Sequence, residues 1–282
     1  MFTRRLVVGL SVMLLAASAV AVQPRTFIMS SQDHSLTSVS DCDSFPATHV
    51  TTLPAIVSAQ EHRDVTLGTD DSLRVRTSEE GGLWISGWDK PFARVTVCKY
   101  GVGLTSAAAE RALSVINVSS RDGQVTADGP EVTSDQVWWA HMIVRVPKNA
   151  TLDIASLNGG IAIRNVTGRV TARAVNGGIS VASSSGDHRL STEHGGIRLD
   201  HVSGRVEATS RTGPISLKLR GLASLPKIFA QTEEGGGIIC SSKLCEGARW
   251  NDDHTEFRLA GRTSGSIRLF SGTAPIIIEQ VR

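Results

Sequence analysis

The sequence predicts an all-β fold, a parallel β-solenoid with 18-residue coils, and three observations support this. Gly-Gly-Ile triplets begin at Gly159, Gly177 and Gly195, and a related Gly-Pro-Ile begins at Gly213, so the copies share one 18-residue period. Apolar and polar residues alternate after each triplet, which is typical of β-strands. The period does not drift, which indicates that each repeat forms one coil of a stack.

The first 21 residues are predicted to be a secretory signal peptide. Arg4 and Arg5 precede an apolar run from Leu6 to Ala17, and the small-residue pattern Ala19-Val20-Ala21 follows. That run is shorter than the ~20 residues that a membrane span needs, so no span is expected after cleavage. A buried N-terminal helix is the structural alternative, and Thr3-Arg4-Arg5 leaves twin-arginine export open. The chain is therefore expected to be exported, to the periplasm, the cell surface or the medium.

Charge is balanced in the exported chain. The sequence has 29 basic and 27 acidic residues, and loss of Arg4 and Arg5 leaves 27 of each. A neutral chain lacks the basic footprint of a nucleic-acid-binding protein, so no such partner is expected. Because a solenoid grows by adding coils, residues 71–282 are predicted to form one domain.

Four cysteines in an exported chain are expected to form two disulfides, and their spacing favours one of the three pairings. Cys240 and Cys245 enclose only four residues, whereas Cys42 and Cys98 lie far apart in the first half. We predict the bonds Cys240–Cys245 and Cys42–Cys98. Zinc is the alternative, but it usually uses Cys-x-x-Cys pairs, which this sequence lacks.

The part of the chain before residue 141 is predicted to lack the regular 18-residue repeat. Residues 22–70 are rich in Ser and Thr and are expected to be irregular, tied down through Cys42. Residues 71–140 are expected to form irregular coils, beginning with the alternation after Ser72. The alanine-rich run after Thr105 predicts one short helix, with Thr105 or Ser106 as its N-cap.

Residues 141–221 are predicted to form the regular coils, with two strands in each. Strand side chains alternate between the two faces, so the apolar columns point inward and the residues between them point outward. A second strand in each coil surrounds Val170 and Val206 and follows the glycines at 168, 186 and 204. The inward columns are Ile161, Ile179, Ile197, Ile215 and Ile163, Val181, Leu199, Leu217; the outward positions are Ala162, Ser180, Arg198 and Ser216.

Stacking explains why the chain repeats itself, because one coil cannot bury its own apolar stripe but a stack of coils can. Glycine is expected at the corners because they need backbone conformations that β-branched residues resist. Asn158 and Asn176 are predicted to form a short amide ladder at one corner. Residues 222–282 are expected to hold a disulfide-loop insertion followed by the terminal coils.

Charged residues on the outer faces alternate in sign between neighbouring coils. Asp187 falls between Arg169 and Arg205, and Arg189 falls beside Glu207. Exposed pairs of this kind contribute about 0.2–1 kcal/mol each. We interpret them as setting the stacking register, with a charged binding site as the alternative.

The sequence predicts no metal site, no cofactor and no catalytic residues. Calcium-binding β-rolls need aspartates after the glycines, and these are absent. His188, His194 and His201 share no column, so they are not expected to converge on one ion. No two acids share a column either, as a glycosidase would require.

Aromatic residues supply one candidate recognition surface; the ends of the stack and a hydroxyl-rich outer face, made by Thr171, Ser180, Ser183, Thr209 and Ser216, are the others. Trp84 and Trp88 stand in the irregular first half, together with the pair Trp138-Trp139. The competing interpretation is that these side chains close the end of the core, which is the commoner use of aromatics in a solenoid.

The stretch from Val144 to Val181 resembles the putative adhesin family of exported bacterial proteins. The residues that carry this resemblance are Val146, Pro147, Leu152, Ile154, Asn158 to Ile161, Val166, Gly168 and Val170. It extends over about Ser72 to Gly221 and implies a β-solenoid and an export signal. The family domain has no assigned activity, so the resemblance implies no site residues.

The sequence therefore predicts a non-enzymatic, exported β-solenoid that acts as an adhesion or interaction scaffold at the cell envelope. Its partner would be an envelope protein or a glycan. The alternative is a carbohydrate-active β-helix enzyme, a hydrolase or lyase, whose acids converge only in the irregular half. An acid cluster in the folded chain would favour the enzyme.

Overall fold

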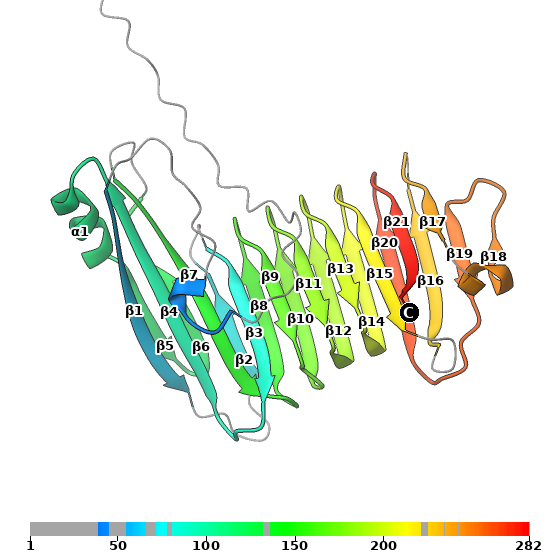
Figure 1. The fold of residues 1–282 in the computed structure, drawn as a ribbon, viewed down its shortest axis with the longest axis horizontal. Coiled ribbons are helices and arrows are strands. Elements are labelled where there is room, and N and C mark those ends of the chain that lie inside the picture. Colours follow the sequence, from blue (N-terminus) through cyan, green and yellow to red (C-terminus); the bar gives the residue numbers. More distant parts are fainter. Residues whose placement is uncertain are drawn as a thin grey trace, which may run out of the picture.

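The computed structural model describes residues 39–44, 55–65, 72–77, 81–131, 136–220, 225–233, 235–241 and 243–281. The predicted signal peptide lies outside these residues. The described chain is predominantly β, in two mixed sheets that run side by side along the long axis of the molecule (Figure 1). The single α-helix of the described ranges, α1 (Ser106–Ser114), lies at the end formed by the early strands, and the last strands in each sheet lie at the other end (Figure 1).

The two sheets take alternate strands from the chain over the regular repeats. Sheet A contains, in spatial order, β1 (Ala55–Val65), β4 (Ala93–Gly103), β7 (Gln136–Pro147), β3 (Leu83–Trp88), β9 (Ile161–Arg164), β11 (Ile179–Ala182), β13 (Ile197–Asp200), β15 (Ile215–Arg220), β21 (Ile276–Val281) and β17 (Ile238–Cys240). Sheet B contains β18 (Arg249–Trp250), β19 (Glu256–Leu259), β16 (Lys227–Thr232), β20 (Ser266–Ser271), β14 (Ser203–Ser210), β12 (Ser185–Thr192), β10 (Arg169–Ala174), β8 (Thr151–Ser156), β2 (Ser72–Arg76), β6 (Gln124–Asp128) and β5 (Asn117–Arg121). Two short 3₁₀ helices, η1 (Cys42–Ser44) and η2 (Lys243–Gly247), complete the described elements.

The predicted columns of the regular repeats are confirmed. Strands β9, β11, β13 and β15 pair in parallel, and equivalent positions of successive repeats stand opposite each other, as Ile179 does with Ile161 and Ile197. The same register joins β10, β12 and β14 in sheet B. The inward isoleucines are at most 2% exposed and belong to one core cluster that both sheets share. Repeated apolar side chains thus build one narrow core between the sheets.

The first glycine of each Gly-Gly corner is required by close stacking. A Cβ at Gly177 would lie 2.1 Å from the carbonyl oxygen of Gly159, and a Cβ at Gly195 would lie 2.2 Å from that of Gly177. The expected reason, an unusual backbone conformation, applies instead at the other corner, where Gly186 and Gly204 have φ of 122° and 91°. Glycine is therefore required for close stacking at Gly177 and Gly195, and for a positive φ at Gly186 and Gly204.

The expectation that all strands are parallel is wrong for both ends of the stack. Strands β1, β4 and β7 pair antiparallel, and so do β5 with β6 and β16 with β19. The connection between β3 and β4, residues 89–92, is too short for a parallel crossover, so the chain returns in the opposite direction. Asp122 and Gly123 both have positive φ and join β5 to β6 by a two-residue hairpin turn.

The expectation that residues 22–70 are irregular is also wrong where they can be described beyond residue 44, because Ala55–Val65 form β1. Polar residues such as Ser58 and Glu61 hide the strand pattern. The strand forms because β4 supplies backbone hydrogen-bond partners along its whole length. It forms one edge of sheet A.

The terminal strands do not follow the order of the chain. Strand β20 lies between β14 and β16, and β21 lies between β15 and β17. The last two strands therefore occupy the layer next to the regular repeats, while β16 and β17 lie one layer further out. The described strands from β16 to β21 therefore follow a spatial order of their own at this end of the two sheets.

Candidate functional site

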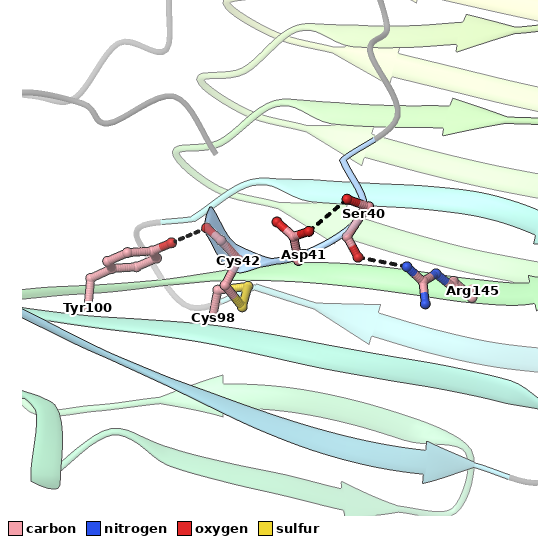
Figure 2. The surroundings of a disulfide bond; sticks show 6 residues. All are labelled: Ser40, Asp41, Cys42, Cys98, Tyr100 and Arg145. Carbon is pink, nitrogen blue, oxygen red and sulfur yellow. Dashed lines mark hydrogen bonds between the residues drawn. A yellow bond between two sulfur atoms is a disulfide. The ribbon is translucent and has the colours of Figure 1, made fainter. Parts of the chain in front are cut away.

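The disulfide Cys42–Cys98 holds a short segment, residues 39–44, across the outer face of sheet A. We call this segment the N-terminal strap. The sulfur atoms are 2.02 Å apart, and the Tyr100 hydroxyl donates to the carbonyl oxygen of Cys42 at 2.9 Å (Figure 2). The Arg145 guanidinium donates to the carbonyl oxygen of Ser40 at 2.7 Å (Figure 2). Three contacts from β4 and β7 therefore position the strap.

The second predicted disulfide, Cys240–Cys245, is also present, and it joins β17 to η2 at the opposite end of the molecule. The spacing of the cysteines was thus sufficient to predict both bonds. Disulfides form and persist in oxidising compartments, so the two bonds indicate an exported or surface protein.

Trp84 lies beside the strap rather than on an open face. It projects from β3 on the outer side of sheet A, opposite Ile143 of β7. Its ring meets the ring of His141 edge-on, with centroids 5.9 Å apart, and it packs in a cluster with Ile143, Cys98 and Val39. The indole is therefore half-buried and helps to seat the strap.

His141 is a buried, neutral histidine at the centre of this cluster. Its Nδ1 accepts the backbone N–H of Gly82 at 2.9 Å, next to the first Gly-Gly corner. Burial lowers the pKa of His141 to about 4. At neutral pH the ring links β7 to the corner before β3 without carrying charge.

Trp88 lies four residues further along β3, at the loop that leads into β4. Its Nε1 donates to the carbonyl oxygen of Phe92 at 2.8 Å, and the two rings contact edge-on at 5.0 Å. The Lys90 ammonium stands 4.9 Å from the Trp88 ring centre. The Trp88 indole thus makes its N–H hydrogen bond and its ring contact with residues of the loop that follows β3.

The three histidines of the regular repeats lie in different environments. His188 is 1% exposed and stands in the inward column between Val170 and Val206. Burial lowers its pKa and outweighs the opposing effects of the Ser185 backbone and Asp187. His194 is exposed at a corner, and His201 contacts Asp200 at 2.8 Å. In the described ranges, no three His, Cys, Asp or Glu side chains are grouped to hold a metal ion.

Hydroxyl side chains at the corners bind the backbone of the neighbouring repeat, and one asparagine side chain binds another. Thr192 donates to the carbonyl oxygen of Gly177 at 2.8 Å, and Ser210 donates to that of Gly195 at 2.9 Å. The predicted amide contact between Asn176 and Asn158 is present at 2.7 Å. These polar groups serve the stacking of the coils.

The ionic contacts differ in part from the predicted cross-strand pairs. Asp187 contacts Arg169 at 3.6 Å, as predicted, but Arg189 also contacts Asp187, at 3.5 Å. Lys218 contacts Glu279 of β21 at 3.8 Å. Some guanidinium groups therefore share one carboxylate.

Two of the hollows on the described surface can be compared with a glycosidase cleft, and neither resembles one. A hollow of about 580 Å³ lies beside β14 and β20, and no Asp or Glu is among the described residues that line it. Another, of about 540 Å³, lies beside β5 and β6 and has Asp122 as its one acid among the described lining residues. A pair of carboxylates is needed for glycoside hydrolysis in most families.

Within the described part of the chain, none of the helices has the length and apolar character needed to cross a membrane.

Comparisons with known proteins give only distant similarities. No family model matches the sequence, and no curated protein matches it either. The structure of a putative cell adhesion protein from Clostridium sporogenes is similar at 13% identity and a TM-score of 0.39. The match covers 80% of this chain and 100% of that protein's chain. The structure of a putative adhesin from Bacteroides fragilis is similar at 11% identity and a TM-score of 0.40. The match covers 79% of this chain and 97% of that protein's chain.

A putative lipid binding protein from Parabacteroides distasonis is also similar, covering 79% of this chain with 97% of its own, at 11% identity and a TM-score of 0.29. Likeness at this level assigns neither a partner nor an activity to the chain.

Proposed function

We propose that this protein is an exported β-solenoid that acts, without catalysis, as an adhesion or interaction scaffold at the cell envelope. The observation that carries the proposal is the pairing of parallel strands at a constant 18-residue offset. This pairing produces long outer faces on two sheets, and such extended faces are typical binding surfaces of repeat proteins.

The use of the polar side chains supports a scaffold over an enzyme. The corner hydroxyls and the asparagine pair bind backbone or each other, and Asp153 and Asp187 contact arginines on the same face. His141 and His188 are buried between strands. Catalytic acids and bases instead need access to a substrate in a shared cleft.

The test separates binding from turnover. Purified protein is incubated with washed cell envelopes and with a panel of envelope polysaccharides, and both co-sedimentation and release of new sugar ends are measured. We expect saturable co-sedimentation with no release of sugar ends. Release that disappears when a single Asp or Glu is replaced would contradict the scaffold and favour a glycosidase or lyase.

A further inference from the structure

The zero net charge of the exported chain conceals a strong separation of charge along the sequence. Residues 136–232 hold 12 Lys and Arg against 5 Asp and Glu, a net charge of +7. Residues 22–135 hold 9 against 15, a net charge of −6. The basic part coincides with the regular repeats, so the positive charge is displayed on the stacked strands.

Five of the twelve basic residues of this part lie on the outer face of sheet B, where Arg74, Arg76 and Arg268 join them. The seven strands from β2 to β16 place their outward residues in three rows that cross the sheet. The pairing registers align these rows from strand to strand. Their charged members are eight basic residues, Arg74, Arg76, Arg169, Arg173, Arg189, Arg205, Lys227 and Arg268, and three acidic residues, Asp153, Asp187 and Glu207.

Two of the acids are each shared between two arginines. Asp153 contacts Arg76 at 2.8 Å and Arg173 at 3.5 Å. Asp187 likewise contacts both Arg169 and Arg189. Sharing leaves a net positive face, and the side chains of Arg169, Arg173 and Arg189 remain 63%, 61% and 52% exposed.

The rows have the dimensions of an extended polymer site. Seven strands at about 4.8 Å spacing span about 29 Å. Thr171, Ser191 and Thr209 lie between the arginines and offer hydroxyl groups along the same rows. A linear ligand with regularly spaced anionic groups would meet guanidinium and hydroxyl donors over the whole length.

An aromatic pair ends the rows at β16 and β20. The rings of Phe229 and Phe270 lie 5.7 Å apart and are partly exposed, and Arg258 of β19 covers the Phe229 ring at 4.9 Å. Arg268 stands directly opposite Phe229 in the sheet register. Apolar ring faces beside charged donors suit a pyranose ring, which has apolar C–H faces and polar edges.

We propose that the outer face of sheet B binds a linear anionic polysaccharide, an inference that rests on the proposed scaffold function and names its ligand. Nucleic acid fits less well, because single strands are held by aromatic platforms along their length, whereas the aromatics here lie at one end. A lipid surface also fits less well, because described side chains of the face offer few apolar groups to insert. The phosphate, sulfate or carboxylate of the glycan is the group recognised.

The test compares two variants that lose the same charge. The face variant is Arg173→Gln/Arg205→Gln/Arg268→Gln. The control variant is Arg111→Gln/Arg211→Gln/Arg220→Gln, whose exposed arginines lie on α1, at a corner and on β15. Binding is measured to polygalacturonate, heparin, uncharged dextran, an oligothymidylate and vesicles containing phosphatidylglycerol. Thermal unfolding of both variants checks that they fold.

We expect binding to polygalacturonate or heparin, and a loss of about tenfold or more in the face variant against less than about threefold in the control. Equal losses in the two variants would overturn the proposal, because net charge alone would then explain binding. Tighter binding of oligothymidylate or vesicles than of either polysaccharide would overturn it as well.

Failure of this inference is distinguishable from failure of the scaffold. Envelopes that co-sediment with the protein while neither anionic polysaccharide binds would overturn the assigned ligand and leave the scaffold in place. Release of sugar ends would instead overturn the scaffold itself.

Discussion

The regular repeats and the early part of the molecule reach stability by different means. From β8 to β15, strands of four to eight residues repeat one apolar pattern, and stacking of identical columns supplies the core. Around β1, β4 and β7, strands of 11 or 12 residues pair antiparallel, and α1, aromatic rings and a disulfide are added. The interior of the stack is thus stabilised by repetition of one apolar pattern. The early end is stabilised by particular side chains, which do not repeat.

The edges of the two sheets show why the ends need additional elements. An open parallel stack would present unpaired backbone groups to other chains. At the far end, β17 and β18 are only three and two residues long, and the Cys240–Cys245 bond lies beside them. At the near end, α1 lies beside the early strands (Figure 1).

The largest expected effect comes from placing a charged side chain in one of the buried apolar columns. Ile179→Asp places an unpaired charge between Ile161 and Ile197, and we expect a loss of several kcal/mol that prevents folding. Thr209→Asp, on an exposed outward position of β14, should change the melting temperature little. Circular dichroism melts of both variants check this, and equal effects would remove the assignment of inward and outward faces.

Removal of the strap disulfide should destabilise the early part more than removal of the terminal one. The Cys42–Cys98 bond joins residues 56 apart, so Cys42→Ser/Cys98→Ser should cost about 4 kcal/mol on chain-entropy estimates. Cys240→Ser/Cys245→Ser, across a separation of 5, should cost about 2 kcal/mol. Urea unfolding measures both losses.

Hydrogen exchange locates the effect of the strap. In Cys42→Ser/Cys98→Ser, exchange should rise on β4 and β7 while β11 and β13 stay protected. Uniform acceleration over the whole chain would show that the two regions do not differ in the way described.

Acid should weaken the protein through its buried histidines. The folded pKa of His141 is about 4, against about 6.5 in the unfolded chain. Below pH 6.5 the unfolded state therefore binds a proton that the folded state does not, and the free energy of unfolding falls until about pH 4. The expected loss of unfolding free energy is about 3 kcal/mol from His141. His188 adds a further loss, because burial lowers its pKa as well.

The matched variant is His188→Val, which completes the apolar column between Val170 and Val206. It should reduce the slope of stability with pH and leave the part due to His141. Unfolding measured from pH 7.5 to pH 4.5 tests this, and an unchanged slope in the variant would contradict the role given to His188.

The sequence was sufficient for the regular repeats because each contact there is set by a local pattern. Ile179 pairs with Ile197 because the same triplet precedes both, and the offset needs no knowledge of distant residues. The helix start at Thr105 and the Cys240–Cys245 bond also followed from short-range signals, and the Cys42–Cys98 bond then remained as the second pair. The Thr105 hydroxyl accepts the N–H of Ala108.

The early strands and the terminal layer depend on contacts that no local pattern encodes. β1 forms through pairing with β4, and β20 enters between β14 and β16 from a much later part of the chain than β14. The Asp122-Gly123 hairpin did carry a local signal, since Asp-Gly is typical of two-residue turns.

The candidate surface could be predicted only in part, because opposite charges along the repeats suggested complete pairing. The structure shows Asp153 and Asp187 each shared by two arginines, which leaves the face basic. Trp84, which was predicted with Trp88 as a recognition residue, packs beside the strap.

The central structural claim is that each 18-residue repeat makes one interchangeable layer, and a deletion tests it most directly. Removing residues 177–194 joins Asn176 to Gly195 and should bring β9 onto β13 and β10 onto β14 in the same register. Removing 180–196 instead, one residue fewer, joins Ile179 to Ile197 inside a strand, so that Ile197 takes the outward position and Arg198 the inward one. The account predicts a cooperative thermal transition for the 18-residue deletion and none for the 17-residue deletion; cooperative unfolding of both, or of neither, would contradict it.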